Sequence, residues 1–432
     1  MAVIEGVRGA ALGAVQPRFF YGWVMLGVAM LGMFASGPGQ SHTFSVFVGP
    51  ISEELGVSPA AVGSAYAVAT LAAAFGLPFM GRLVDRFGPR WAAVRVSLVF
   101  GLACMAFGAA PGLILLGLGF AALRFLGQGS LMLISANLVS QWFDKRRGTA
   151  MSLMALGFAL SMAVHPPLGQ LLIESFGWRT AWIGLGLITW VLLLPPYLLL
   201  VIDRPEKADL RPDGVATPAP ADGEAAQPAE IKGLTLSEAM RTSAFYLILI
   251  GLFSISMLVT VLHFYQVTVF EENGFSPRTA SLAFTVSALT MAATMPLVGR
   301  LLDRVATRFV FAAALVTMSA ALLLATVIAT LPGLVIYALV FGLTNAFSIT
   351  LFGYMWPRFF GRRHVGSIQG TGQTVLVVGA SLGPPVLGFA AELSGGFDAP
   401  LRWAAIAPVA AAGLSALFLK TPAALGEGMG KD

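Results

Sequence analysis

Long apolar runs divide this sequence, and they decide what the chain can fold into. Several runs exceed the roughly 18 residues needed to cross a bilayer. The 432 residues are 57% hydrophobic and only 11% charged, against about 25% charged in a soluble domain. Backbone groups in lipid must find partners within their own segment, so unbroken runs predict helices, whereas a β-barrel needs short alternating segments. We therefore predict an all-α membrane protein.

Charged residues, prolines and glycines divide these runs into twelve candidate helices. The expected spans are 21–48, 60–80, 91–110, 112–140, 149–173, 179–202, 243–270, 278–298, 309–330, 333–356, 366–391 and 400–419. Proline, alanine and acidic residues dominate the stretch 203–242, which predicts a partly disordered linker. No cleavage site follows a short apolar core near the N-terminus, so we expect the first run to be retained. The predicted domains are two six-helix bundles, 1–202 and 243–432, joined by this linker.

The positive charges predict an orientation. With the N-terminus inside, inner segments carry 22 of the 26 lysines and arginines, and outer segments carry 3. This asymmetry is the positive-inside pattern, which puts both termini and the linker in the cytoplasm. It also explains the net charge of +5 without a nucleic-acid partner. We expect a multi-pass protein of a cell membrane, namely a bacterial inner membrane.

The two halves of the chain repeat each other. GRLVDRFGPR at 81–90 returns as GRLLDRVATR at 299–308, an offset of 218. The same offset maps Pro166-Pro167 onto Pro384-Pro385 without a gap. A single ungapped offset over such a distance indicates a duplicated six-helix unit.

These repeated segments carry a resemblance to a known family. GRLVDRFGPR resembles the G-x-L-x-D-R-x-G-x-R signature of the major facilitator superfamily, although the second copy lacks the second glycine. RFLGQG at 124–129 resembles the helix-4 signature of that superfamily. The resemblance implies twelve transmembrane helices in two pseudo-symmetric bundles, and a secondary transporter that works by alternating access.

Three further stretches are similar to the bacterial monocarboxylate and oxalate/formate porter branch. They are YGWVM at 21–25, SVFVGPISEELG at 45–56 and FFGRRH at 359–364. Two features depart from that branch: the helix-8 interior 279–299 is uncharged, and 366–391 holds no lysine. The usual anion-binding cation of the second half is therefore missing, so the substrate could also be less charged or bulkier.

The resemblance also implies a cytoplasmic gate in the two repeated loops. Charges at a sealed, partly dry interface can bias two packed arrangements of helices. The alternative is that the arginines only fix the topology. The candidate gate residues are Asp85, Arg86, Arg90, Asp303, Arg304 and Arg308.

Charge inside the predicted membrane region is positive or titratable. No aspartate or glutamate lies near a predicted helix midpoint. A cationic substrate or a carboxylate proton relay would require a buried acid there. Arg124 instead lies about 18 Å into helix 4 at roughly 1.5 Å per residue. His42, His165 and His263 also fall within helices, whereas His364 lies in an inner loop. An arginine with histidines at a wet midplane favours a small organic anion.

Helical spacing and a break in helix 1 select the side chains expected at the cavity. Pro38, between two glycines, kinks helix 1. Stripes at i, i+4 and i+7 include Arg124 and Gln128 on helix 4, and Ser256, Thr260 and His263 on helix 7. The candidate substrate-binding residues are Gln40, Ser41, His42, Arg124, Gln128, His263, Asn345 and Gln373. The candidate proton-coupling residues are Arg124, His42, His165 and His263.

Each of these candidates has a structural alternative. An uncharged side chain could make an ordinary interhelical hydrogen bond. His165, before two prolines, could bond a freed carbonyl, and Arg124 could bond backbone carbonyls of the kinked Pro38 region.

The sequence predicts a secondary transporter of a small organic anion, such as a monocarboxylate, with proton symport. The proton would travel on a histidine or on the carboxylate of the substrate. The alternative is a proton-coupled exporter of amphipathic or drug-like compounds, since 17 methionines and 31 phenylalanines suit a plastic pocket. No catalytic triad or metal cluster is visible, so we expect no enzyme, no metal and no cofactor. We expect a monomer whose partners are the substrate, the proton and the lipid bilayer.

Overall fold

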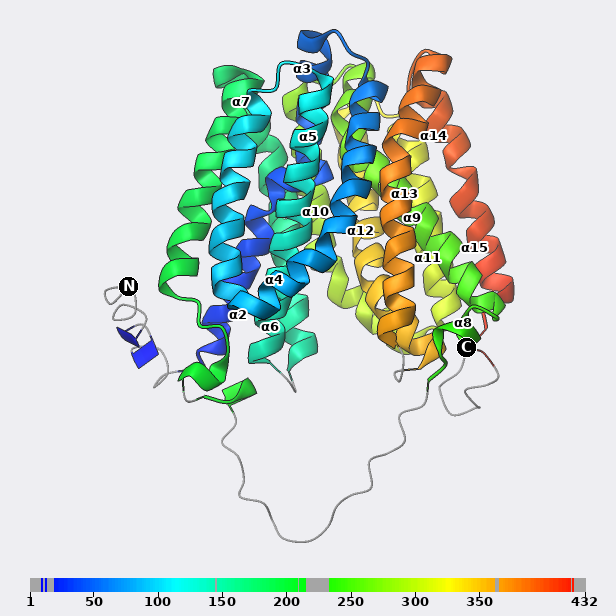
Figure 1. Ribbon diagram of the computed structural model, residues 1–432. Coiled ribbons are helices and arrows are strands. Elements are labelled where there is room, and N and C mark those ends of the chain that lie inside the picture. Colours follow the sequence, from blue (N-terminus) through cyan, green and yellow to red (C-terminus); the bar gives the residue numbers. More distant parts are fainter. Residues whose placement is uncertain are drawn as a thin grey trace. The chain divides into compact units, whose positions relative to one another are not determined.

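The chain folds into helices of membrane length, as the apolar runs predict (Figure 1). This computed structural model describes residues 9–10, 12–13, 19–143, 146–208, 210–214, 233–361, 365–420 and 422, without the side chains of 78, 85, 147, 148 and 365–367. In these ranges ten helices are long and apolar enough to cross a membrane. One of them, Thr149–Leu199, has 51 residues and is interrupted at Gly177, and the first crossing is built from two shorter helices. Counting Thr149–Leu199 as two crossings and adding the first crossing gives twelve, so the predicted twelve crossings are confirmed.

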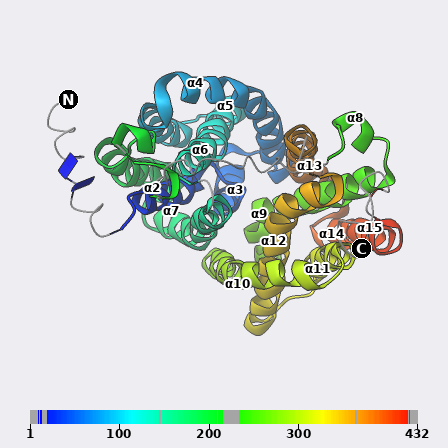
Figure 2. The ribbon, with the colours of Figure 1, turned by 90° about the horizontal axis from the view of Figure 1, so that it is seen from below.

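The first compact unit comprises Met1–Val57 and Val68–Glu224. Within it, α2 packs against α6 and α7, and α3 packs against α7. Figure 2 views its helices from below. Its elements are α2 (Gly22–Ala35), η1 (Gly37–Gly39), α3 (Ser41–Leu55), α4 (Pro59–Gly108), α5 (Leu113–Leu123), η2 (Arg124–Leu131), α6 (Met132–Trp142), α7 (Arg147–Leu199), η3 (Pro205–Ala208) and η4 (Pro212–Gly214).

The second compact unit comprises Ser58–Ala67, which starts α4, and Ala225–Asp432. Within it, α10 packs against α12, α13 against α9, and α11 against α15. Its other elements are α8 (Leu236–Ala239), α9 (Ser243–Glu272), α10 (Pro277–Arg304), α11 (Thr307–Ala325), α12 (Leu331–Phe360), α13 (Val365–Ser394), α14 (Asp398–Ala404) and α15 (Ile406–Phe418). The predicted domain limits stay a prediction, and 215–232 of the predicted linker lies outside the described residues.

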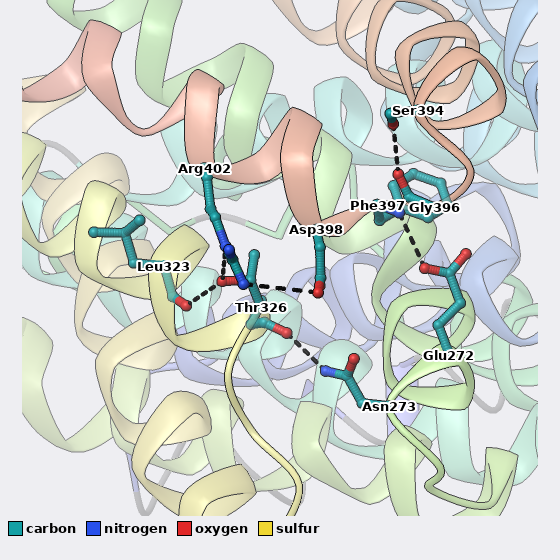
Figure 3. A network of polar contacts seen from close by, with 10 residues as sticks. Glu272, Asn273, Leu323, Thr326, Ser394, Gly396, Phe397, Asp398 and Arg402 are labelled. Atoms are coloured by element: carbon teal, nitrogen blue, oxygen red, sulfur yellow. Dashed lines mark hydrogen bonds and ion pairs between the residues drawn. The ribbon is translucent and has the colours of Figure 1, made fainter.

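A polar network joins the helix ends in unit 2 (Figure 3). At the end of α9, the Glu272 carboxylate accepts a hydrogen bond from the backbone N–H of Phe397 at 3.0 Å. Arg402 on α14 donates to the Thr326 hydroxyl at 3.3 Å, and Asn273 donates to the carbonyl of Ala325 at 2.8 Å. Both ends of α14 are thereby tied to neighbouring helices, its start to the end of α9 and its last turn to the end of α11.

Unit 1 repeats the central contact of this network at the offset of 218. Glu54 corresponds to Glu272, and its carboxylate accepts a hydrogen bond at 2.7 Å from the side-chain Nε of Arg179. Arg179 corresponds to Phe397, which donates through its backbone N–H. In both units a glycine with φ of 77° stands two residues before the bonded residue. The sequence repeat therefore extends to a tertiary contact.

The repeated motif at 81–90 forms a sharp break between two helices and not an extended loop. Helical structure continues through these residues, and only Gly88, with φ of 79° and ψ of 157°, departs from it. A Cβ at Gly88 would lie 2.8 Å from the Asp203 carboxylate. The corresponding residue of the second copy is Ala306, with φ of −52°, which any residue adopts. The second glycine is thus needed only in the first copy.

Candidate functional site

The break in helix 1 is held by its own side chains. The turn η1, with Pro38 at its centre, separates α2 from α3. The Thr43 hydroxyl donates to the carbonyl of Gly37 at 2.6 Å, and the Gln40 amide donates to the Ser36 hydroxyl at 3.0 Å. All five of these residues are buried. Polar groups freed by the kink are thereby satisfied, as a break in an apolar environment requires.

Arg124 is the first residue of η2, in the middle of the predicted span 112–140, and it reaches this break. Its side chain is buried, with 4% exposed. Nη1 donates to the carbonyl of Gly39 at 3.1 Å, and Nε donates to the Thr70 hydroxyl of α4 at 3.1 Å. A Cβ on Gly39 would lie 2.4 Å from the carbonyl oxygen of Leu123, so glycine is what permits this approach. The contact between Arg124 and the Pro38 region, considered from the sequence as a structural alternative, is therefore present.

The residues that follow Arg124 form a π-helix, η2, and not the α-helix that the sequence predicts. Turns with i→i+5 hydrogen bonds are rare and occur frequently at functional sites. The predicted stripe assumed a period of 3.6, which does not hold across this segment. Gln128 on it is half-buried, and Ser135, seven residues further along the chain, is buried beside the Tyr197 hydroxyl.

Two of the predicted histidines meet at a serine in unit 1. The Ser161 hydroxyl lies 3.3 Å from Nε2 of His42 and 3.2 Å from Nδ1 of His165. Nδ1 of His165 also lies 3.1 Å from the carbonyl oxygen of Ser161. The His165 ring contacts Phe34 at 4.9 Å between centroids, and the His42 ring contacts Phe158 at 5.5 Å. All three polar side chains are at most 3% exposed.

In unit 2, His263 lies among aromatic rings. Its ring centroid is 5.1 Å from that of Phe341 and 6.2 Å from that of Phe284. The Asn345 amide donates to the carbonyl of Phe341 at 2.8 Å, so both predicted residues contact the same part of α12. Gln373, predicted beside them, is exposed on α13.

The helix-7 stripe is partly structural. Its first member, Ser256, donates to the carbonyl of Leu376 on α13 at 2.8 Å, which is the ordinary interhelical bond considered from the sequence. Thr260 donates to the carbonyl of Ser256 on its own helix at 2.8 Å.

The described structure thus forms two groups of predicted residues, one in each unit. Around the helix-1 break of unit 1 it brings together Gln40, Ser41, His42, Arg124, Gln128 and His165. In unit 2 it joins His263 and Asn345 through Phe341 and leaves Gln373 apart.

Comparison with known proteins identifies the family of the chain. The model of the Major Facilitator Superfamily matches residues 22–273 and 248–428. The chain belongs to the Major Facilitator Superfamily. It is therefore a multi-pass membrane transporter of a small molecule and not an enzyme, as the sequence predicts.

Two curated relatives lie in the predicted branch. The transporter is 27% identical over 256 residues to the oxalate:formate antiporter of Oxalobacter formigenes. This alignment covers 57% of this chain and 54% of that protein. It is 29% identical over 182 residues to monocarboxylate transporter 3 of Mus musculus, covering 42% of this chain and 37% of that protein. The chain thus spans about half or less of each of these relatives. The resemblance to the monocarboxylate and oxalate/formate branch is confirmed.

A solved structure has the same fold. It is the bacterial homolog of the human lysosomal transporter Spinster, with a TM-score of 0.66 and 16% identity. The alignment covers 93% of this transporter and 96% of that chain. At this identity the likeness concerns the fold alone.

Of the predicted gate residues of unit 1, Arg90 contacts the end of α7 and the residues after it. The backbone N–H of Arg90 donates to the Asp203 carboxylate at 3.0 Å, and Nη2 of Arg90 donates to the carbonyl of Leu198 at 3.0 Å. Arg86 lies 5.3 Å above the ring of Phe87. The Asp85 side chain lies outside the described residues.

The predicted gate residues of the second copy lie at the end of α10 and the start of α11. Asp303 and Arg304 are exposed, and Arg308 is half-buried with its guanidinium 4.8 Å from the ring centre of Phe309. His364 and its neighbours in the FFGRRH stretch lie outside the described residues. The gate role of both copies stays a prediction.

Sequence reasoning missed two residues that contact predicted side chains of unit 1, Thr70 and Ser161. Ser161 stands four residues before His165, so the i, i+4 spacing could have indicated their contact. Thr70 is a single hydroxyl in an apolar run, and nothing local indicates that it meets Arg124 from another helix.

Proposed function

We propose that this transporter moves a small organic anion of the monocarboxylate class in symport with a proton. The observation that carries the proposal is the buried guanidinium of Arg124 at the break in helix 1. A mid-membrane arginine costs about 2.5–3.5 kcal/mol on an insertion scale, so such residues usually serve a function. Its charge-assisted, planar donors suit a carboxylate.

The repeat relationship supports this role for unit 1. Position 124 corresponds to Gly342 in the second copy, where a Cβ would lie 2.3 Å from the carbonyl oxygen of Ser287. Close helix packing occupies the position that holds the arginine in unit 1. The duplicated fold therefore does not itself require a cation there.

Histidine is the proposed carrier of the proton. Among the side chains, histidine is the one whose unperturbed pKa lies in the physiological range. His42 and His165 flank the same helix break that Arg124 contacts, and the sequence puts no carboxylate near a helix midpoint. An acid relay would need such a carboxylate, so the two histidines are the available groups of unit 1.

The remaining proposals concern the setting of transport. The positive-inside pattern supports cytoplasmic termini and a bacterial inner membrane. The repeated loops with Arg90 and Arg308 would form the cytoplasmic gate, and the protein would act as a monomer.

Uptake by proteoliposomes tests the proposal. Radiolabelled formate, oxalate and lactate are supplied outside, with and without an imposed gradient that is acidic outside. We expect at least one carboxylate to accumulate, and the acidic gradient to increase its accumulation. Tetraphenylphosphonium, a lipophilic cation, is offered in parallel. Transport of this cation without carboxylate uptake would support the exporter alternative and contradict our proposal, and carboxylate uptake indifferent to the gradient would contradict symport.

A further inference from the structure

The contact of two histidines with one serine hydroxyl suggests a path for the proton. We propose that Ser161 relays a proton between His42 and His165, so that the two histidines share the one proton that is transported. This proposal rests on the proposed proton symport and assigns a role to a residue outside the predicted site. Its basis is the short, buried series of polar atoms from Nε2 of His42, through Oγ of Ser161, to Nδ1 of His165.

The donors and acceptors of this series can be assigned from chemistry. A backbone carbonyl only accepts, so in the 3.1 Å contact with the Ser161 carbonyl it is Nδ1 of His165 that carries hydrogen. The Ser161 hydroxyl has one hydrogen and two lone pairs. With Nδ1 of His165 protonated, the hydroxyl accepts from that nitrogen and donates its own hydrogen to Nε2 of His42. His42 is then an acceptor at Nε2.

The relay step moves two hydrogens and conserves charge. It begins with His42 protonated on both nitrogens and His165 neutral, with its hydrogen on Nε2. Nε2 of His42 gives its proton to Oγ of Ser161, and the former hydroxyl hydrogen passes to Nδ1 of His165. One N–H and one O–H bond break, and one of each forms. Afterwards His42 is neutral, His165 is the cation, and the serine is again a hydroxyl.

The backbone favours the end of this step. Once Nδ1 of His165 is protonated, it can donate to the Ser161 carbonyl as well as to the hydroxyl. A hydrogen bond to the charged form of a group stabilises that form. The carbonyl of Ser161 therefore accepts a hydrogen bond from the newly protonated Nδ1 and stabilises the transferred proton on His165 in this arrangement of α3 and α7.

The same geometry limits the pair to one proton. Two positive imidazoliums on either side of one hydroxyl would repel each other in a buried setting. The packed elements α2, α6 and η1 carry no charged side chain among their described residues. Among the side chains that the structure describes, the other charged or titratable groups on the packed elements are Arg124 on η2, Glu53 and Glu54 at the end of α3, and Glu174, Arg179 and Tyr197 on α7. Arg124, also a cation, contacts the same break and would disfavour a second positive charge.

The second repeat indicates that packing does not require these polar groups. Ser161 and His165 correspond to Gly379 and Gly383 on α13. A Cβ at Gly379 would lie 3.0 Å from the Phe253 side chain, and one at Gly383 would lie 2.6 Å from the carbonyl of Met257. The same positions of the duplicated unit are thus filled by close contact with α9. Ser161 and His165 therefore have a role in unit 1 other than the helix packing that both repeats share.

The hydrogen-bonded series can be tested without a substrate. The chain has only 4 histidines, so selective labelling with ¹⁵N-histidine gives a small set of ring-nitrogen signals that report tautomer and protonation. His42→Gln and His165→Gln variants assign two of them. We expect Ser161→Ala to shift the signals of both His42 and His165, whereas Ser161→Thr, which keeps the hydroxyl, shifts neither appreciably. If Ser161→Ala moves one ring or none, the series does not exist as proposed.

Transport measurements test whether the series carries the proton. In proteoliposomes loaded with the carboxylate that the wild type accumulates best, exchange of labelled for unlabelled substrate does not need net proton movement. We expect Ser161→Ala to lose at least tenfold in accumulation driven by an acidic exterior while exchange stays within twofold of wild type. Ser97→Ala is the matched control, because Ser97 of unit 1 is also fully buried and its hydroxyl has no hydrogen-bond partner among the described residues.

The outcomes separate the two proposals. If the wild type accumulates no carboxylate in response to the gradient, the proposed symport is wrong and the relay has no transported proton to carry. If the wild type does and Ser161→Ala accumulates equally well, only the relay is wrong. Loss of exchange together with accumulation in Ser161→Ala, but not in Ser97→Ala, would make Ser161 a structural residue and would also overturn the relay.

Discussion

Replacing Arg124 by alanine is the sharpest test of the proposed anion site. The substitution removes two hydrogen bonds from a charged donor, to Gly39 and to Thr70. Bonds of this kind contribute about 1.5–3 kcal/mol each. Removing a mid-membrane arginine also recovers about 2.5–3.5 kcal/mol on the insertion scale. The two effects oppose each other, so we expect a loss of folding free energy of no more than about 3.5 kcal/mol.

We expect Arg124→Ala to reduce carboxylate affinity more than it reduces folding stability. Truncating one member of a buried charge pair weakens binding by about 2–5 kcal/mol. At about 1.4 kcal/mol per tenfold, carboxylate affinity should fall by roughly 30-fold to 3,000-fold. Scintillation-proximity binding and proteoliposome uptake measure this, and size-exclusion elution and Tm check folding. Arg124→Lys keeps the charge but not the planar fork, so its carboxylate affinity should lie between those of the wild type and Arg124→Ala.

A second arginine provides the matched control. Arg402 forms an ion pair with Asp398 at 3.8 Å, and its side chain is 56% exposed. Exposed pairs contribute about 0.2–1 kcal/mol, and a net hydrogen bond such as the one to the Thr326 hydroxyl contributes about 0.5–1.5 kcal/mol. Arg402→Ala should therefore lower Tm by a small amount and leave uptake close to wild type. Carboxylate uptake by folded Arg124→Ala within twofold of wild type would refute the reasoning and leave Arg124 as a brace for the helix-1 break.

Three packing predictions follow from the same structure. Gly39→Ala puts a Cβ 2.4 Å from the backbone oxygen of Leu123 at the end of α5, and it should lower the free energy of unfolding by about 1–3 kcal/mol or more. As its control, Gly27→Ala on α2 meets nothing within 4 Å and should leave Tm unchanged or slightly raised. Gly88→Ala combines a φ of 79° with a contact of 2.8 Å to Asp203, so its Tm should fall, and a Tm equal to wild type would contradict the assigned backbone. Ser256→Ala removes an interhelical bond, for which we expect about 0.6 kcal/mol of lost stability and unchanged uptake. Lost uptake in this variant would contradict a purely structural role for Ser256.

Local features of the sequence predicted much of the fold. Membrane helices follow from apolar length, because lipid leaves the backbone no partner outside its own segment. The break at Pro38 is equally local, since proline removes a donor wherever it stands within a helix. The 218-residue offset predicted the duplicated unit, and the contacts of Glu54 and Glu272 follow the same offset.

The sequence also indicated which polar side chains would gather in unit 1, but not how they pair. Gln40, His42, Arg124 and His165 were all selected by charge or by proximity to a kink. Their pairing required contacts between helices far apart in sequence, such as His42 with Ser161. The π-helix after Arg124 was missed because the period of 3.6 was assumed throughout the segment.

By itself, the sequence determined that the chain is a duplicated, multi-helix membrane protein with a cation and histidines in its apolar interior. Tertiary structure alone decided that Arg124 donates to Gly39 and Thr70, and that one hydroxyl, that of Ser161, joins two histidines. The physical reason is the range of the forces involved. Burial and backbone satisfaction act within a segment and leave a periodic trace in the sequence, whereas a hydrogen bond between helices depends on a few ångströms of packing that no single segment encodes.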